Sequence, residues 1–200
     1  MTVREVFRLL VVVPWIVFLI YWIVSAIRTR VTVQTESFAS RYAILLIEVV
    51  GFVLLFRHSA GIGFLGTRFM HRTLASAIAG LILIWMGIGL AIWARYHLAE
   101  YWSARITIKE DHELIRTGPY GFVRHPIYTG MLSAILGTAI SFGEWRGLLA
   151  FALLTVALLL KLRREERFMS ESFPNDYPRY RAEVPALIPF IASTRAANPD

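Results

Sequence analysis

The polar groups that could bind a ligand are concentrated in residues 111–130, immediately before an apolar run. This stretch combines imidazole, carboxylate and guanidinium side chains with two tyrosines and a Gly118-Pro119 turn. Such groups can hold a polar ligand at the edge of a membrane. A structural reading also exists, because Pro126 suits the first turn of a helix, and Arg124 with His125 can anchor that helix among lipid headgroups. The residues alone leave both readings open.

A second group of charged side chains follows the last apolar run of the chain. It consists of Lys161, Arg163, Arg164, Glu165 and Glu166. Neighbouring charges of this kind commonly pair with one another on a solvated helix end. They can equally bind the charged groups of a ligand.

Glu48 differs from these residues because it interrupts an apolar run. A carboxylate inside a membrane span is a functional hypothesis by default. It also fits an ion pair with an arginine in the interior of a helix bundle, or a helix that lies at the interface. We assign it no catalytic role.

Other common kinds of site have little support. Glu110, Asp111, His112 and Glu113 are adjacent, but no histidine pair has the spacing that places two metal ligands on one helix face. The chain has no cysteine, so thiolate ligands and nucleophiles are excluded. No Gly-x-Gly-x-x-Gly motif follows a strand, which argues against a Rossmann cofactor site. We therefore expect no metal centre.

The elements that must position these residues are membrane helices. Of the 200 residues, 56% are apolar and only 18% are charged, which excludes a soluble globule. At about 1.5 Å per residue, the longer charge-free runs cross a hydrocarbon core of roughly 30 Å. The apolar runs are residues 9–27, 42–56 with Glu48 inside, 73–94, 126–143 and 147–160. We predict an all-α integral membrane protein with about five transmembrane helices, the last two forming a tight hairpin.

The basic residues predict the orientation of these helices. Residues 28–41, residues 95–124 and the tail from residue 161 hold fifteen Lys and Arg, and the segments on the other side hold six. This asymmetry follows the positive-inside rule, and it places the 95–124 loop and the C-terminal tail on the cytoplasmic side, where they can enclose a cofactor site. It also explains the net charge of +7 better than nucleic acid does, because no basic stripe with interleaved aromatics is present.

The chain divides at residue 95 in this interpretation. Residues 1–94 form a membrane region with the first three helices. Residues 95–200 form a catalytic region with the last two helices and the tail. Within the loop, the alternation of apolar and polar residues at 105–109 predicts a short extended piece.

Four motifs follow one another in the second half of the chain. They are Gly118-Pro119-Tyr120, the run from Arg124 to Gly130 ahead of the hairpin, Arg163-Arg164-Glu165-Glu166, and Tyr177 with Tyr180 ahead of Val184-Pro185. Over residues 105–191 this order resembles the isoprenylcysteine carboxyl methyltransferase family. The resemblance implies an integral membrane enzyme that moves a methyl group from S-adenosylmethionine to a carboxylate of a lipid-modified or prenylated acceptor.

The resemblance also implies site residues. The contacts it implies to S-adenosylmethionine are His112, Glu113, Leu114, Ile115, Tyr120, His125, Pro126, Ile127, Tyr128 and Glu165. The backbone of 112–115 would bind adenine, and Glu165 would receive the ammonium group. Aromatic faces beside a sulfonium add about 0.5–2 kcal/mol of cation–π stabilisation.

The resemblance further implies a basic residue that holds the acceptor carboxylate, one helical turn before the acidic pair. Lys161 stands at that position in place of an arginine, and Arg163 is the arginine nearest to it in the sequence. We name both as catalytic candidates, with Arg163 first because a guanidinium can grip both carboxylate oxygens. A phospholipid amine or a small thiol is an alternative acceptor. An NADPH-dependent membrane reductase of the sterol type is an alternative enzyme, and a plain binding or scaffold protein is an alternative without catalysis.

Overall fold

The computed structural model describes residues 1–26, 38–98 and 114–189. Helices are the regular elements of these ranges, apart from one isolated antiparallel bridge between Arg68 and Glu144. The elements are α1 (Val3–Ala26), α2 (Phe38–Phe56), η1 (His58–Ala60), η2 (Gly63–Gly66), α3 (Leu74–Leu98), η4 (Gly118–Gly121), α4 (Pro126–Phe142), α5 (Trp145–Ser172) and α6 (Asp176–Glu183). The predicted all-α class is confirmed for these ranges. The extended piece expected at 105–109 lies outside them.

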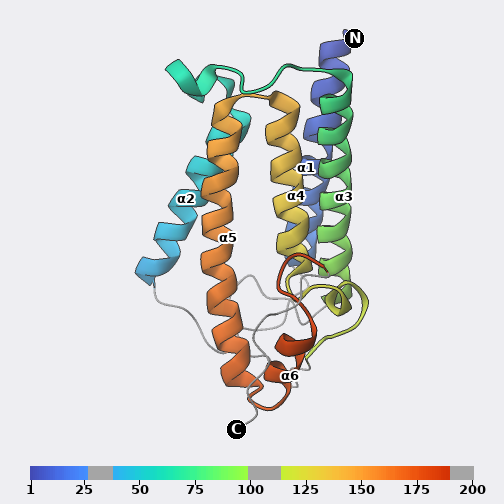
Figure 1. Ribbon diagram of the computed structural model, residues 1–200, viewed down its shortest axis with the longest axis vertical. Coiled ribbons are helices and arrows are strands. Elements are labelled where there is room, and N and C mark those ends of the chain that lie inside the picture. The colour runs from blue at the N-terminus through green and yellow to red at the C-terminus, as the bar shows by residue number, and fades with distance from the viewer. Residues whose placement is uncertain (27–37, 99–113, 190–200) are drawn as a thin grey trace.

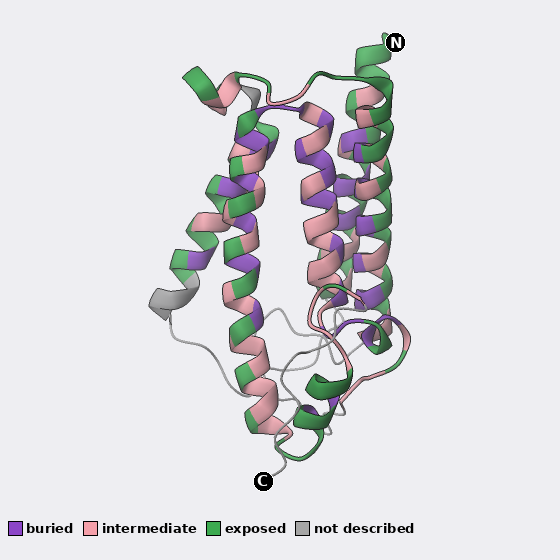
Figure 2. Cartoon of the chain, viewed as in Figure 1, coloured by how far each residue is buried: buried purple, intermediate pink, exposed green. Residues whose placement is uncertain are grey.

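Helices α1 to α5 run in alternating directions and form an elongated bundle (Figure 1). Three of them, α1, α3 and α5, are long and apolar enough to cross a membrane, whereas α4 and the apolar part of α2, Tyr42–Phe56, are shorter. The outward surfaces are exposed (Figure 2) and carry large apolar side chains such as Leu19, Ile23 and Met86. Lipid rather than water suits such surfaces.

Helices α3 and α4 touch at their backbones. Gly87 faces Gly130, and a Cβ atom added to either glycine would lie 2.4 Å from the carbonyl oxygen of the other. Gly80 and Gly137 repeat the arrangement seven residues away, with a Cβ at Gly137 only 2.6 Å from the Gly80 oxygen. Small residues permit this close approach between membrane helices. The contact holds α4 against α3 along its length.

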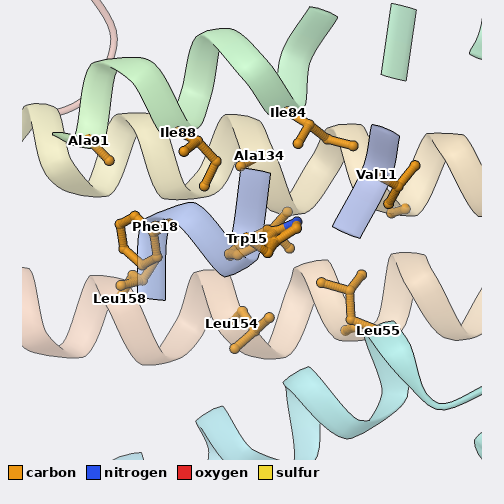
Figure 3. Close-up of a cluster of buried hydrophobic side chains, with 13 residues drawn as sticks. Val11, Trp15, Phe18, Leu55, Ile84, Ile88, Ala91, Ala134, Leu154 and Leu158 are labelled. Atoms are coloured by element: carbon orange, nitrogen blue, oxygen red, sulfur yellow. The ribbon is translucent and has the colours of Figure 1, made fainter. Parts of the chain in front are cut away.

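Trp15 of α1 lies at the centre of the buried cluster (Figure 3). Its indole N–H donates to the Thr138 hydroxyl of α4 at 3.1 Å. Its ring meets Phe52 and Phe56 of α2 edge-on, with centroids 5.8 and 5.6 Å apart. The indole therefore joins α1, α2 and α4, and its polar N–H is satisfied inside an apolar core.

The predicted hairpin between α4 and α5 is confirmed. Gly143 ends α4 with φ of 67°, a left-handed conformation that favours glycine. The Arg146 Nε lies 2.5 Å from the Glu144 carboxylate. The Arg146 guanidinium also donates to the carbonyl oxygens of Leu54 and Leu55 at 2.6 and 2.9 Å, which caps the carboxyl end of α2.

Helix α5 continues to Ser172, well beyond the apolar run that ends at residue 160. Its charged final turns therefore extend past the apolar part of the bundle. At the same end lie the start of α4 and helix α6 (Figure 1). This end of the molecule brings the two charged groups of the sequence together.

Candidate functional site

The centre of the candidate site consists of His125, Tyr128 and Glu165. His125 precedes Pro126, which begins α4 as expected, and Tyr128 lies in the first turn of that helix. The His125 and Tyr128 rings stack with centroids 5.7 Å apart and planes 4° apart. The Tyr128 hydroxyl donates a hydrogen bond to the Glu165 carboxylate, and His125 Nδ1 lies 3.5 Å from its second oxygen. The glutamate side chain remains 34% exposed, so a ligand can reach it.

The neighbouring carboxylate, Glu166, has a different environment. Its Oε1 atom lies 2.5 Å from the Arg124 guanidinium and 3.4 Å from His125 Nε2. Arg181 of α6 lies 3.8 Å from its other oxygen. Only 12% of the Glu166 side chain is exposed. Glu166 is therefore largely enclosed by its protein partners, whereas Glu165, which contacts Tyr128 and His125, stays more exposed.

The imidazole of His125 lies between these two carboxylates. Burial alone would lower the pKa of His125, but hydrogen bonds and attraction to Glu165 and Glu166 outweigh it, and the net effect raises the pKa. His125 precedes α4 and lies outside the membrane-spanning helices. A raised pKa favours the imidazolium, which donates to both carboxylates.

The C-terminal tail is fixed on the start of α4 by backbone groups. The amides of Arg124 and His125 donate to the carbonyls of Pro185 and Ala186 at 2.9 and 3.0 Å. The Thr129 hydroxyl lies 2.7 Å from the Leu187 carbonyl oxygen and donates to it. We call residues 184–187 the tail segment. It lies directly against the residues that carry the site.

Arg124 connects the tail to α5 as well. Besides Glu166, its guanidinium donates to the carbonyl oxygens of Arg181 and Val184. Its side chain is only 6% exposed. Arg124 is therefore not a headgroup anchor, which was the structural alternative left open by the sequence.

Tyr120 lies under the tail. It is buried in η4, its hydroxyl donates to the Ala94 carbonyl at 3.4 Å, and its own carbonyl accepts the Tyr180 hydroxyl of α6 at 2.7 Å. Burial, with the nearby charge of Glu165, raises the pKa of Tyr120. Gly118, with φ of 59°, begins this turn against the His97 ring. The Gly-Pro-Tyr motif thus joins α3 to α6 beside the site.

The other expected contacts to a cofactor are placed as follows. Pro126 is buried at the start of α4, and Ile127 is half-buried beside it. Leu114 and Ile115 are half-buried and precede η4. His112 and Glu113 lie outside the described residues.

The two basic candidates occupy different sides of α5. Lys161 and Glu165 are four residues apart and therefore share one face of the helix. Arg163 is two residues from each, which places it on the opposite side, and its side chain is exposed. The structure therefore brings Lys161, and not Arg163, to the side of Glu165.

Lys161 has a partner that sequence reasoning did not identify. Its Nζ atom lies 2.5 Å from the Oε1 atom of Glu48 on α2. The side chains are 39% and 19% exposed. The sequence offered an ion pair with an arginine as one alternative for Glu48. The structure shows an ion pair, but the partner is a lysine.

A shallow, open groove runs along the face of α2 that carries Glu48, and we call it the α2 groove. Its lining is apolar except for Glu48 and, at the far end, Arg57. The lining residues are Leu45, Glu48, Val49, Phe52, Val53, Phe56 and Arg57. The groove therefore starts near Lys161 and leads along α2 away from Glu165.

The arrangement suits a small cationic or zwitterionic ligand better than a metal ion. Among the described residues, no group of three or more His, Asp and Glu side chains can hold a metal. Glu165 offers an accessible carboxylate, and Tyr128 offers an aromatic ring next to it. A carboxylate that receives an ammonium group, with a tyrosine ring for a sulfonium, matches the chemistry of S-adenosylmethionine.

Sequence reasoning missed three contributions to this site. Thr129 and Arg181 have no distinctive motif, because their contacts are to a tail carbonyl and to Glu166. The pairing of Glu48 joins residues 113 positions apart. The only sequence signal for that pair was a single carboxylate in one apolar run and a single lysine at the end of another.

Comparison with known proteins is consistent with this chemistry. Residues 75–176 match the family described as phospholipid methyltransferase. The chain is 35% identical over 83 residues to protein-S-isoprenylcysteine O-methyltransferase of Schizosaccharomyces pombe, covering 41% of this chain and 35% of that protein. It is 30% identical over 88 residues to protein-S-isoprenylcysteine O-methyltransferase B of Arabidopsis thaliana, covering 44% of this chain and 45% of that protein.

A relative with a different name is also similar. The chain is 32% identical over 120 residues to cobalt-zinc-cadmium resistance protein CzcN of Cupriavidus metallidurans, covering 59% of this chain and 53% of that protein. The chain therefore spans between about a third and a half of the length of these three relatives. The segment that matches the family, residues 75–176, includes α4 and the charged end of α5.

Proposed function

Because the chain belongs to the phospholipid methyltransferase family, we propose that it transfers the methyl group of S-adenosylmethionine to a carboxylate of an isoprenylcysteine-like acceptor, giving a methyl ester. The observation that carries the proposal is the accessible Glu165 carboxylate, held by Tyr128 and His125 at the end of the bundle. Relatives named protein-S-isoprenylcysteine O-methyltransferase support this acceptor class.

The residues divide into recognisable tasks in this proposal. Glu165 receives the ammonium group of the methyl donor, and the Tyr128 hydroxyl with the His125 ring holds that carboxylate in place. The backbone of 112–115 binds adenine, and Tyr120, Pro126 and Ile127 shape the apolar wall. S-adenosylmethionine supplies a methyl group on a sulfonium, and the neutral thioether that remains is a good leaving group. An acceptor carboxylate that is already ionised therefore needs no general base.

Positioning and exclusion of water are then the main contributions of the protein. Correct alignment of reacting groups contributes about 7–11 kcal/mol in intramolecular models. The tail segment lies against the start of α4, where it limits the access of water to His125 and Tyr128. This is the kind of dehydrated environment in which electrostatic contacts are strong.

A basic residue on α5 neutralises the acceptor carboxylate. Lys161 and Arg163 are both candidates, and the position of Lys161 on the Glu165 side of the helix favours Lys161. The variants Lys161→Gln and Arg163→Gln distinguish them, because the residue that holds the carboxylate affects transfer and leaves donor binding nearly intact. If both variants keep full transfer, the carboxylate is held elsewhere.

The membrane arrangement that goes with this function has five spans. The alternating directions of α1 to α5 (Figure 1) support it, and the distribution of basic residues supports a cytoplasmic site. A lipid-modified acceptor then reaches the catalytic region, residues 95–200, from within the bilayer.

The experiment is a labelling assay with the full chain in lipid vesicles. Methyl-labelled S-adenosylmethionine is added with N-acetyl-S-farnesylcysteine, and the product is treated with base. The proposal predicts label in the acceptor that base releases, because methyl esters are base-labile. No transfer to this acid, with transfer to another lipid, would contradict the carboxylate assignment.

A phospholipid amine is the second candidate acceptor. The ion pair of Lys161 with Glu48 favours it, since the paired charges are neutral together and do not repel an ammonium-bearing headgroup. An amine acceptor needs a group that takes up its proton, and the candidates at the site are Glu166 and the neutral form of His125. Label that resists base and appears in phosphatidylethanolamine derivatives would support this candidate.

A further inference from the structure

The ion pair between Lys161 and Glu48 is the feature that the proposed reaction does not yet use. It joins α5 to α2 with 2.5 Å between Nζ and Oε1. Lys161 lies one helical turn from Glu165, on the side of the candidate site. The Glu48 carboxylate is therefore already paired with Lys161, the cation to which an acceptor carboxylate would bind.

The geometry of the helices explains why these two side chains meet. Helices α2 and α5 run in opposite directions (Figure 1), and helical side chains lean toward the amino end of their own helix. Glu48 therefore leans toward the site end of the bundle, and Lys161 leans away from it.

The α2 groove begins at this ion pair. Leu45 and Val49 flank Glu48, and Phe52, Val53 and Phe56 continue the apolar surface along the helix. From Leu45 to Phe56 the groove extends for about 16 Å, at about 1.5 Å per residue. A cation at the start of an apolar groove of this length complements an anion that carries one hydrocarbon chain.

We propose that Glu48 occupies the acceptor-carboxylate position on Lys161 and that the acceptor binds by displacing it, with its hydrocarbon chain in the α2 groove. The inference rests on the proposed carboxyl methylation and adds the residue that sets acceptor selectivity. An acid without a hydrocarbon chain gains only the contact with Lys161, and Glu48 competes for that contact at high effective concentration. An acid with a prenyl chain also buries apolar surface, so it displaces Glu48.

The test measures methyl transfer to N-acetyl-S-farnesylcysteine by the full chain in vesicles. Glu48→Gln removes the competing charge, so we expect the KM for this acid to fall at least fivefold, with the change in KM rather than in kcat. The dissociation constant for S-adenosylhomocysteine should not change. In Glu48→Gln/Lys161→Gln the gain should disappear, since no cation remains to be released.

Two further measurements test the role of the acceptor's hydrocarbon chain and the role of its charge separately. Val53→Trp fills the groove and should raise the KM for the farnesylated acid at least fivefold, whereas Leu46→Trp, on an exposed part of α2 outside the groove, should not. The uncharged methyl amide of the same acceptor should inhibit wild type and Glu48→Gln about equally, because it does not compete with Glu48 for Lys161.

The outcomes separate this inference from the proposed function. If wild type does not methylate the farnesylated acid, the proposed function is wrong and this inference with it. If wild type methylates it and Glu48→Gln leaves the KM unchanged or raises it, only the role of Glu48 is wrong. Should Glu48→Gln fail to fold, Glu48→Leu/Lys161→Met replaces the pair by apolar side chains, and full retention of acceptor affinity in that protein would overturn the inference.

Discussion

At the residue scale, the site is built from two adjacent glutamates with different environments. Glu166 is engaged by Arg124, Arg181 and His125, whereas Glu165 contacts Tyr128 and His125 and stays accessible. Consecutive helical residues point about 100° apart, so one carboxylate can fasten the tail while the other faces a ligand. This division explains why a pair of glutamates, rather than one, follows the basic residues.

His125 should make stability depend on pH. Its raised folded-state pKa means that the stabilisation from its imidazolium is complete below the ordinary pKa of about 6.5 and is lost as pH rises through the folded-state pKa. His125→Gln should therefore lower Tm more at pH 6 than at pH 9. Thermal unfolding in detergent over this range measures the difference, with His71→Gln as an exposed control. An equal loss of Tm at both pH values would contradict the ion-pair role.

At the element scale, α4 presents the site because α3 and the tail hold it on two sides. The glycines of α3 and α4 allow backbone contact along the bundle. The tail segment accepts hydrogen bonds from the first residues before and within α4. Displacement of either neighbour should change the position of His125 and Tyr128.

The close packing of α3 and α4 predicts a strong effect at Gly87. A methyl group there would lie 2.4 Å from the Gly130 oxygen and 2.7 Å from the Ala134 nitrogen, so the helices must separate. Gly87→Ala should lower the free energy of unfolding by about 1–3 kcal/mol. Gly89→Ala, with open space around the added Cβ, should be neutral or stabilising by up to about 1 kcal/mol. Chemical denaturation in micelles compares them, and equal stability would refute the contact.

Arg124 should control the attachment of the tail. Arg124→Gln removes the pair with Glu166 and the bonds to Arg181 and Val184, so the tail should detach from α4. We expect trypsin to cleave at Arg181 at least tenfold faster and the affinity for S-adenosylhomocysteine to fall. The matched control is Arg167→Gln, an exposed arginine on α5. Unchanged cleavage would show that backbone contacts alone fix the tail.

The helices could be predicted from the sequence, and most of the contacts of the site could not. Charge-free runs located α3 and α4 within four residues, because lipid-facing helices exclude charge, whereas α1 begins six residues before its run and includes Arg4 and Arg8. The extension of α5 to Ser172 is not visible in the apolar pattern, since its final turns are charged. The tail binds through the carbonyls of Pro185, Ala186 and Leu187, which every residue type possesses, so no side-chain pattern identifies them. The resemblance named His125, Tyr128 and Glu165, and their mutual contacts came from the structure.

At the scale of the whole molecule, the apolar bundle and the polar end have separate roles. Apolar side chains on the outer surfaces suit lipid, and the charged ends of α5 and α6 collect at one end with the start of α4 (Figure 1). Lys161 and Glu48 lie between the two regions. An acceptor with an apolar chain and a charged head would span the same boundary.

The five-span arrangement predicts opposite locations for two reporters. Gly63, in η2 between α2 and α3, should lie outside, and a fusion after Asp200 should lie in the cytoplasm, because an odd number of spans separates them. Paired alkaline phosphatase and fluorescent-protein fusions at these positions measure this directly. Reporters on the same side would mean that one of the three helices between them does not cross, the shorter α4 being the first candidate, and would contradict an enclosed cytoplasmic site.

The most direct test of the account is calorimetric binding of S-adenosylhomocysteine to the full chain and to Glu165→Ala. Wild type should bind one equivalent, without measurable affinity for NADPH. Glu165→Ala should bind more than tenfold more weakly, because a hydrogen bond to a charged group contributes about 1.5–3 kcal/mol. Glu171→Ala, an exposed glutamate on the same helix, should bind like wild type. No binding by wild type, or equal affinity in Glu165→Ala, would contradict the assignment of this cluster as the methyl-donor site.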